Sequence, residues 1–179
     1  LAPGTYTLIC GKLNGKKAKL VVEGDEESMH SAHAAVRVSS TCVDIEDAET
    51  DSAATVVTVN EWTVSSPPSA RAGHINLVVR NAGALAHELV IAKGSVSGLE
   101  IGDEPVDEAV LGKNALIGEL EGLQPGTECN GEFKLAKGDY VLFCNLVNEK
   151  GEKLPDGSTS PKRYVHAAEG MAADFTVTG

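Results

Sequence analysis

Residues 135–144 read LAKGDYVLFC, a turn through lysine and glycine that feeds an apolar strand ending in a cysteine, Cys144. An earlier stretch, AHELVI (86–91), reads as a second apolar strand with an imidazole, His87, at one end. Strand ends from one sheet can place two such side chains on the same rim. These stretches therefore predict a β-sheet fold and a place in it where a thiol and an imidazole meet.

A third stretch, YVHAAEGM (164–171), supplies His166 and Met171 just before the last predicted strand. Two imidazoles, a thiolate and a weakly bound thioether are the ligands of a mononuclear blue-copper site. The thiolate binds either oxidation state of copper, and a long axial thioether raises the reduction potential without imposing a square-planar geometry. Each residue alone is compatible with an ordinary histidine or a buried thiol. Together, their types and order favour a copper site formed by His87, Cys144, His166 and Met171.

The chain from residue 55 onward reads as short strands separated by turn signals, and helical periodicity is scarce. We predict strands at 55–64, 75–81, 88–92, 115–120, 132–135, 140–144 and 173–178, with turns at Pro67-Pro68, 81–83, 124–126 and 136–138. One helical turn is expected near 105–111, where acidic residues precede Gly112. Many short strands with turn signals predict an all-β fold, a Greek-key β-sandwich.

From about residue 54 to residue 179 the chain resembles the cupredoxins, the family of plastocyanin and azurin. The resemblance rests on NAGALAHELV (81–90), on LAKGDYVLFC (135–144), and on His166 followed by Gly170 and Met171. It implies a cupredoxin-like sandwich with one type 1 copper ion. In the family, the first His comes from an early strand, and the Cys, second His and Met come from one loop between the last two strands.

The length of that loop departs from the family's pattern. The family's second His follows the Cys by only a few residues, whereas residues 145–165 intervene here between Cys144 and His166. They include a turn-rich insertion, KGEKLPDGS (150–158).

The resemblance implies a one-electron carrier that cycles between cupric and cuprous states and docks transiently to redox partner proteins. We do not expect an enzyme, because a single type 1 site has no open coordination position and the chain lacks the second cluster of His pairs that multicopper oxidases need. Two other functions stay open. One is a copper-binding or trafficking protein that uses the same residues for delivery; the other is a structural cupredoxin-like module in an extracellular assembly.

The net charge of −11 argues against nucleic acid or an anionic membrane surface as a partner. It favours a basic redox partner or simple solubility, and the acidic residues of 100–108 are expected to form a solvated loop.

No apolar run approaches the roughly 20 residues needed to span a bilayer. Because the chain begins at Leu1 without Met, we expect a processed or truncated product whose upstream segment had room for an export signal or membrane anchor. The resemblance implies a periplasmic or extracellular location.

The N-terminus contains a partial internal repeat. LAPGTYTLIC (1–10) matches 135–144 in its Leu, Ala, Gly, Tyr, Leu and Cys positions, and an Asn-Gly turn leads to a second strand at 17–22. We predict that residues 1–24 form a cupredoxin-like hairpin, either the tail of a preceding repeat or an added hairpin. Residues 25–53 read as an acidic linker with a possible strand at 35–45, a candidate to pair with that hairpin. The cupredoxin domain then spans 54–179.

If Cys144 is a copper ligand, Cys10, Cys42 and Cys129 remain, and an odd number cannot all pair within the chain. One disulfide is expected in an exported protein, and Cys10 with Cys42 is favoured because both precede the copper domain. Free buried thiols are the alternative.

Several other residues have side chains that could bind copper or relay electrons. We expect Met29, His30 and His33 to belong to a solvated linker, although thioether and imidazole groups can bind copper. His74 is expected on the surface at the start of a strand. Trp62 and Phe143 are expected to fill the core.

Overall fold

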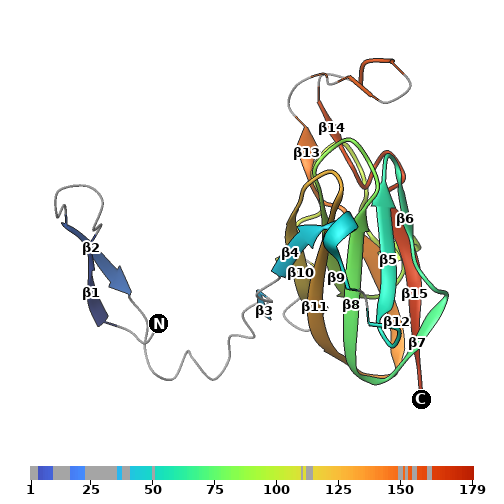
Figure 1. The fold of residues 1–179 in the computed structure, drawn as a ribbon, viewed down its shortest axis with the longest axis horizontal. Coiled ribbons are helices and arrows are strands. Elements are labelled where there is room, and N and C mark those ends of the chain that lie inside the picture. Colours follow the sequence, from blue (N-terminus) through green and yellow to red (C-terminus); the bar gives the residue numbers. More distant parts are fainter. Residues whose placement is uncertain are drawn as a thin grey trace. The chain divides into compact units, whose positions relative to one another are not determined.

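A computed structural model describes residues 4–9, 17–22, 36–37, 41–49, 51–109, 111, 115–148, 151, 153–154, 157–160 and 163–179 (Figure 1). The chain divides into two compact units, residues 1–34 and residues 35–179. In the first unit, β1 (Gly4–Ile9) pairs antiparallel with β2 (Lys17–Val22), which is the strand pairing predicted there. Met29, His30 and His33 lie outside the described residues.

The second unit is a sandwich of two sheets (Figure 1). One sheet has the strand order β3-β10-β9-β12-β15-β7, and the other has the order β4-β11-β8-β5-β6. β8 lies beside β11, and β9 lies beside β12, although neither pair is consecutive in the chain. These are the crossed connections of a Greek key. The predicted all-β sandwich is confirmed.

The strands of this unit have the following bounds. They are β3 (Val36–Arg37), β4 (Thr41–Asp44), β5 (Thr55–Asn60), β6 (Thr63–Ser65), β7 (Ser69–Arg71), β8 (Gly73–Asn81), β9 (His87–Lys93), β10 (Leu116–Leu123), β11 (Thr127–Leu135), β12 (Gly138–Phe143), β13 (Val147–Asn148), β14 (Tyr164–Val165) and β15 (Ala172–Thr178). Two short 3-10 turns, η2 (Ile45–Asp47) and η3 (Val96–Gly98), complete the described elements. Among these residues no helix is long and apolar enough to cross a membrane.

The central strands β9 and β12 are buried on both faces. Successive side chains of a strand point to opposite faces. One face of this pair joins the main core between the sheets, through Leu89, Ile91, Tyr140 and Leu142. The other face joins a second apolar cluster, through Val90, Ala92, Val141 and Phe143. The core role predicted for Phe143 is confirmed, and the two-sided burial explains why both strands read as continuous apolar runs.

Two predicted elements differ from the structure. Residues 55–64 form two antiparallel strands, β5 and β6, which turn at Glu61 and Trp62. The run has no Gly or Pro to mark that turn, so its alternation reads as one strand. Where the helical turn is expected, near 105–111, the described residues form no helix. The Leu111 N–H donates to the carbonyl of Asp107, four residues earlier (3.3 Å), as in a single helical turn.

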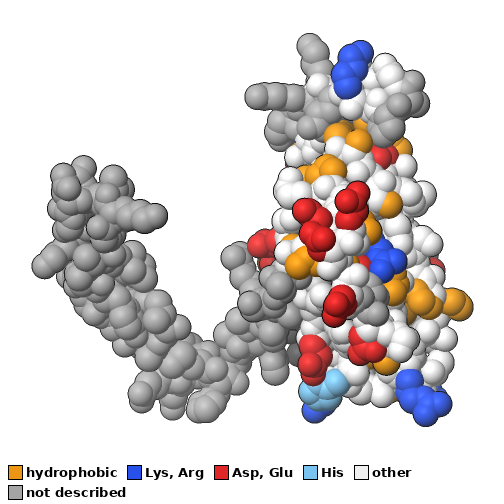
Figure 2. Space-filling view, in the orientation of Figure 1, with side chains coloured by type: hydrophobic (Ala, Val, Ile, Leu, Met, Phe, Trp, Pro, Cys, Tyr) orange, Lys and Arg blue, Asp and Glu red, His pale blue; other side chains and the backbone are white. Residues whose placement is uncertain are grey.

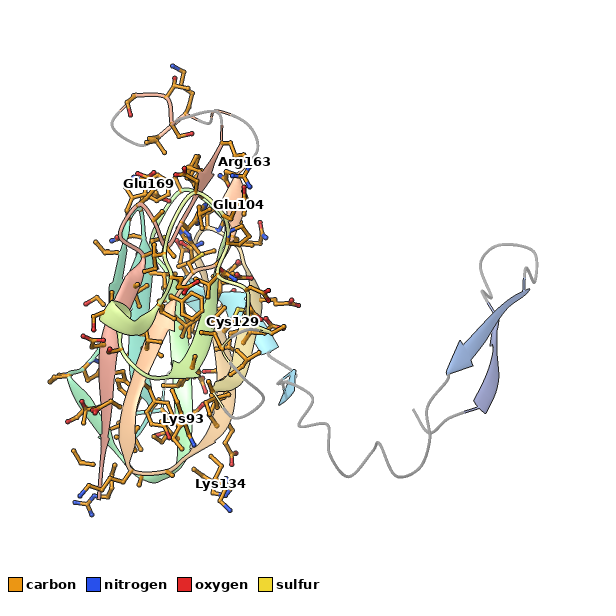
Figure 3. The ribbon with its side chains drawn as sticks, turned by 180° about the vertical axis from the view of Figure 1, so that it is seen from behind. Lys93, Glu104, Cys129, Lys134, Arg163 and Glu169 are labelled. Atoms are coloured by element: carbon orange, nitrogen blue, oxygen red, sulfur yellow. A yellow bond between two sulfur atoms is a disulfide. The ribbon has the colours of Figure 1, made fainter. Side chains whose placement is uncertain are left out.

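The strand inside the predicted linker belongs to the sandwich. β4 pairs antiparallel with β11, which places Cys42 opposite Cys129, and these two form a disulfide (Figure 3). The preference for a bond between Cys10 and Cys42 is therefore wrong, whereas the pairing expected between this strand and the N-terminal hairpin stays a prediction. Nearness in the sequence suggested the wrong pair of cysteines, because the two that strand pairing brings together are 87 residues apart. Cys10 itself lies outside the described residues.

The disulfide fastens the edge strand β4 to the sheet, so its removal is expected to destabilise the sandwich. We predict that replacing both Cys42 and Cys129 with Ala lowers the free energy of unfolding by about 2–4 kcal/mol, because the cross-link restricts the unfolded chain. Urea titration followed by tryptophan fluorescence measures this change. The reduced wild-type protein should behave like the double variant. Equal stability of the double variant and the oxidised wild type would contradict the prediction.

Candidate metal centre

Two adjacent strands place His87 and Cys144 at the same end of the sandwich. β9 begins at His87, and β12 ends just before Cys144. Because these strands are antiparallel, with Phe143 opposite Val90, the start of one lies beside the end of the other. Cys144 is packed in the main core, on the side of β12 that faces the other sheet.

A short hydrogen-bonded loop brings His166 and Met171 to the same place. The Met171 N–H donates to the His166 carbonyl (3.1 Å), and the Cys144 N–H donates to the Met171 carbonyl (3.0 Å). These bonds tie the loop to the end of β12. Met171 is fully buried and belongs to the main core. The chain between β12 and β15 thus supplies a thiol, an imidazole and a thioether, as the sequence predicts.

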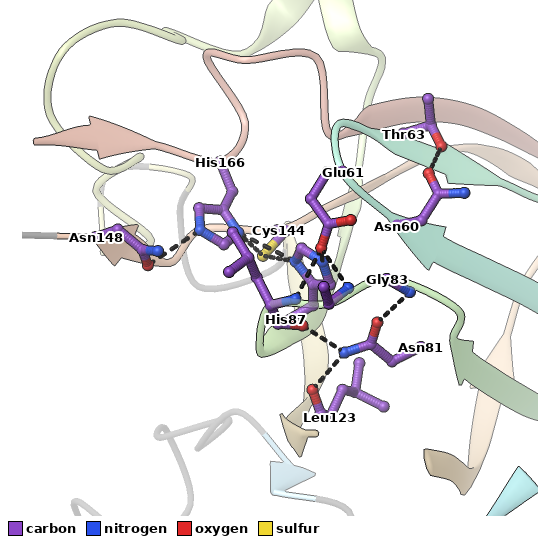
Figure 4. A network of polar contacts seen from close by, with 12 residues as sticks. Asn60, Glu61, Thr63, Asn81, Gly83, His87, Leu123, Cys144, Asn148 and His166 are labelled. Carbon is purple, nitrogen blue, oxygen red and sulfur yellow. Dashed lines mark hydrogen bonds and ion pairs between the residues drawn. The ribbon is translucent and has the colours of Figure 1, made fainter. Parts of the chain in front are cut away.

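Three donor atoms converge at this point (Figure 4). The Nδ1 atoms of His87 and His166 lie 3.1 Å apart, and Cys144 Sγ lies 3.4 Å from His166 Nδ1 and 3.9 Å from His87 Nδ1. All three side chains are buried. Donors on one tetrahedral ion, at about 2.0 Å for nitrogen and 2.3 Å for sulfur, lie roughly 3.3–3.6 Å apart. The trio is therefore spaced to hold one metal ion.

Burial makes the trio uncharged when no metal is bound. It lowers the pKa of His87, against the opposing effect of the Glu61 carboxylate. It also lowers the pKa of His166 to about 4, with a further contribution from His87. The pKa of the Cys144 thiol is raised to about 12, again by burial. The site near neutral pH thus offers two imidazole lone pairs and a thiol, and a metal must displace the thiol proton.

His166 is held by the segment that separates it from Cys144. Its Nε2 lies 3.1 Å from Asn148 Oδ1, and its N–H donates to the Leu146 carbonyl (3.0 Å). Tyr164 stacks on the imidazole with ring centroids 5.5 Å apart, and it accepts a hydrogen bond from Asn148 Nδ2 (2.7 Å). Bonding of Nε2 to Asn148 leaves Nδ1 for a metal. Leu146, Asn148 and Tyr164, which lie between Cys144 and His166 in the sequence, therefore support His166. No local sequence pattern marks Asn148 or Tyr164 for this role.

Trp62 lies at the edge of the site. Its ring makes edge contacts with His166 (centroids 5.4 Å apart) and with Tyr164 (5.0 Å). The side chain is only partly buried and packs on the border of the main core. The core role expected from the sequence is therefore confirmed only in part, because Trp62 also covers the His166 imidazole.

His87 is held by the loop that precedes it. The buried Asn81 side chain donates to the carbonyls of Leu85 (2.7 Å) and Leu123 (2.8 Å), and it accepts the Gly83 N–H (2.9 Å). These bonds fix the turn between β8 and β9. The Asn-Ala-Gly turn seen in the sequence thus positions His87 through the Asn81 amide, a role that the sequence alone did not assign.

Two carboxylates flank the donor trio. The Glu88 N–H donates to Cys144 Sγ (3.5 Å), and the Glu88 carboxylate accepts the Asn145 N–H (3.0 Å). On the other side, the Glu61 carboxylate accepts the N–H groups of Ala84 and Leu85. Burial opposes ionisation of Glu61, but hydrogen bonds from the N–H groups of Leu85, Glu61 itself and Ala84 keep its pKa below the usual value.

His74 takes no part in the site. Its side chain is 67% exposed and pairs with Glu132 on the surface. The expectation that His74 is a strand-start surface residue is confirmed.

No family model and no curated protein matches this sequence. Similar solved structures include reduced auracyanin from Roseiflexus castenholzii, at 22% identity over 73% of this chain and 100% of that chain, with a TM-score of 0.48. Auracyanin A, described as a "blue" copper protein from Chloroflexus aurantiacus, shows 16% identity over 69% and 99% of the two chains, with a TM-score of 0.42. Amicyanin from Paracoccus versutus shows 17% identity over 77% and 92%, with a TM-score of 0.39.

The fold and the donor set implied by the cupredoxin resemblance are present in the structure. The chain forms a Greek-key sandwich, and one end of it gathers the two imidazoles and the thiol. The buried Met171 is joined there through backbone hydrogen bonds to Cys144 and His166. These are the residue types of a type 1 copper site.

Glu88 is predicted to make the stability of the copper-free protein depend on pH. Burial raises the pKa of Glu88 to about 7, against the hydrogen bond from Asn145 and with the help of Glu108, Glu119 and Glu121. Between about pH 4.3, the ordinary Glu value, and pH 7 the folded chain binds more protons at Glu88 than the unfolded chain. Protonated Glu88 therefore stabilises the folded chain fully below about pH 4.3, and this stabilisation is lost as the pH rises through 7.

The Glu88→Gln variant isolates this effect, because it keeps the oxygen that accepts the Asn145 N–H. The free energy of unfolding of the variant, minus that of wild type, should increase by about 2–3 kcal/mol between pH 4 and pH 8. Urea titrations at a series of pH values measure the difference, and the subtraction removes the opposite contributions of His87 and His166. A difference that stays constant with pH would refute the assignment.

Proposed function

We propose that this protein is a type 1 copper protein that carries single electrons between redox partners. His87, Cys144 and His166 would hold the copper, and the buried Met171 would supply a weakly bound thioether. The observation that carries the proposal is the convergence of two imidazole nitrogens and one thiol sulfur, 3.1–3.9 Å apart, in a buried site. A bound copper ion would supply the one-electron couple, and the protein's part is to hold the ligands.

The surroundings of the donors suit electron exchange with little rearrangement. The His166 ring is fixed by Asn148 and Tyr164, and Cys144 accepts a hydrogen bond from the Glu88 N–H. Ligands fixed in this way have the same positions for cupric and cuprous ions, and an apolar shell and hydrogen bonds to the sulfur tune the potential. Because both oxidation states fit one arrangement, the electron can leave or arrive without the site being rebuilt.

The same burial disfavours catalysis and copper delivery. His87, Cys144 and His166 are at most 1% exposed, whereas a catalytic metal site keeps an open coordination position that substrate can reach. A trafficking protein must also pass its metal to a partner, and here the rings of Trp62 and Tyr164 pack against the buried His166 imidazole. Slow copper loss to a chelator would agree with the carrier function, and rapid loss would favour delivery.

We infer a basic redox partner and an exported location. The chain has a net charge of −11, and Figure 2 shows Asp and Glu side chains along one face of the sandwich. Opposite charge on a partner would speed the encounter, with a rate that falls as the ionic strength rises. The Cys42–Cys129 disulfide supports a periplasmic or extracellular location, since such bonds persist in oxidising compartments.

The visible absorption spectrum of the protein with one equivalent of cupric ion tests the copper assignment. Wild type should show an intense copper–thiolate band that is absent from the Cys144→Ser variant. The double Cys42→Ala and Cys129→Ala variant is the matched control and should keep the band, because its cysteines lie outside the donor cluster. A wild-type protein that binds no copper, or binds it without the thiolate band, would leave the sandwich as a structural module and refute the carrier function.

A further inference from the structure

Among the described residues, the outer nitrogen of His87 has no hydrogen-bond partner. His87 Nδ1 faces His166 and Cys144, so its Nε2 points away from the donor cluster. The side chain is completely buried, and Nε2 makes no hydrogen bond within the part of the chain that the structure describes. The carboxylate oxygen Oε1 of Glu61 lies 3.4 Å from this nitrogen, close but not yet bonded (Figure 4). His166, in contrast, has its Nε2 bonded to the neutral Asn148 side chain.

The Glu61 carboxylate is itself fixed in place. Its Oε1 accepts the N–H groups of Ala84 and Leu85, each at 2.8 Å, and its side chain is only 10% exposed. A Cβ atom at Gly83 would overlap this carboxylate, so the loop approaches it as closely as only glycine allows. The turn between β5 and β6 and the loop before β9 therefore form a built cradle that aims one carboxylate oxygen at His87.

We propose that Glu61 is the positioning residue for His87, accepting a hydrogen bond from its Nε2–H when copper is bound at Nδ1. The inference rests on the proposed copper function. A neutral imidazole that gives Nδ1 to a metal carries its proton on Nε2, and that buried N–H needs an acceptor. A carboxylate in this position fixes the ring and increases the basicity of the ligand. Its negative charge also favours the cupric state over the cuprous state.

The first test uses the wild-type protein with cuprous ion, which is diamagnetic. The Nε2–H of His87 should give a downfield proton resonance that exchanges slowly with water and shows a contact to the Glu61 side chain. This signal should be lost in Glu61→Ala and weakened in Glu61→Asp, whose shorter side chain keeps the charge but withdraws the oxygen. Gly83→Ala, which displaces the same carboxylate, should reproduce the loss.

The second test measures cupric affinity and reduction potential. Loss of a supporting hydrogen bond of this kind costs about 10–100-fold in metal affinity. Glu61→Ala should show that loss and a higher reduction potential. Glu61→Gln, which keeps an acceptor oxygen but removes the charge, should lose less affinity than Glu61→Ala and still raise the potential. Glu169→Gln is the control, because it removes an exposed carboxylate three residues after His166 and should change the affinity less than threefold.

The outcomes separate the two proposals. Absence of the copper–thiolate band from the wild type would refute the copper function and this inference with it. A normal band in the wild type, with unchanged affinity, potential and Nε2–H exchange in the Glu61 variants, would overturn the inference alone. Glu61 would then serve only to hold residues 83–85, and its variants would lose stability without any change at the metal.

Discussion

The structure depends on the burial of two imidazoles and a thiol against one another. Polar groups removed from water are costly unless they find partners, and here three donor atoms face a common point. A metal ion at that point would satisfy all three at once. The strands, the loop before His87 and the long segment before His166 all act to keep these donors together.

The donors are held by elements that are far apart in the sequence. β9 and β12 place His87 and Cys144, and the hydrogen bonds between Cys144, Met171 and His166 close the end of the sandwich. The segment before His166 is also fastened on its outside. Arg163 donates to the Asp103 carbonyl (2.5 Å) and to the Glu104 carboxylate (2.8 Å), which joins it to the acidic loop (Figure 3). Arg163 therefore ties the residues just before β14 to residues 103 and 104.

The sequence predicted those parts of the site whose signal is local. His87 and Cys144 stand at the ends of apolar strands, and His166 and Met171 precede the last strand, so strand order was enough to bring the four together. Glu61 and Asn148 could not be found in this way, because their roles depend on contacts with residues 18 or more positions away. The Cys42–Cys129 bond was missed for the same reason, since it follows from the pairing of β4 with β11.

Copper X-ray absorption, recorded on the cupric and cuprous forms of the same protein, tests most directly whether this buried cluster is a fixed electron-transfer site. A fixed electron-transfer site should show one short copper–sulfur bond and two imidazole nitrogens in both oxidation states, with nearly the same distances. A copper ion without a sulfur ligand, or one that loses an imidazole on reduction, would contradict it.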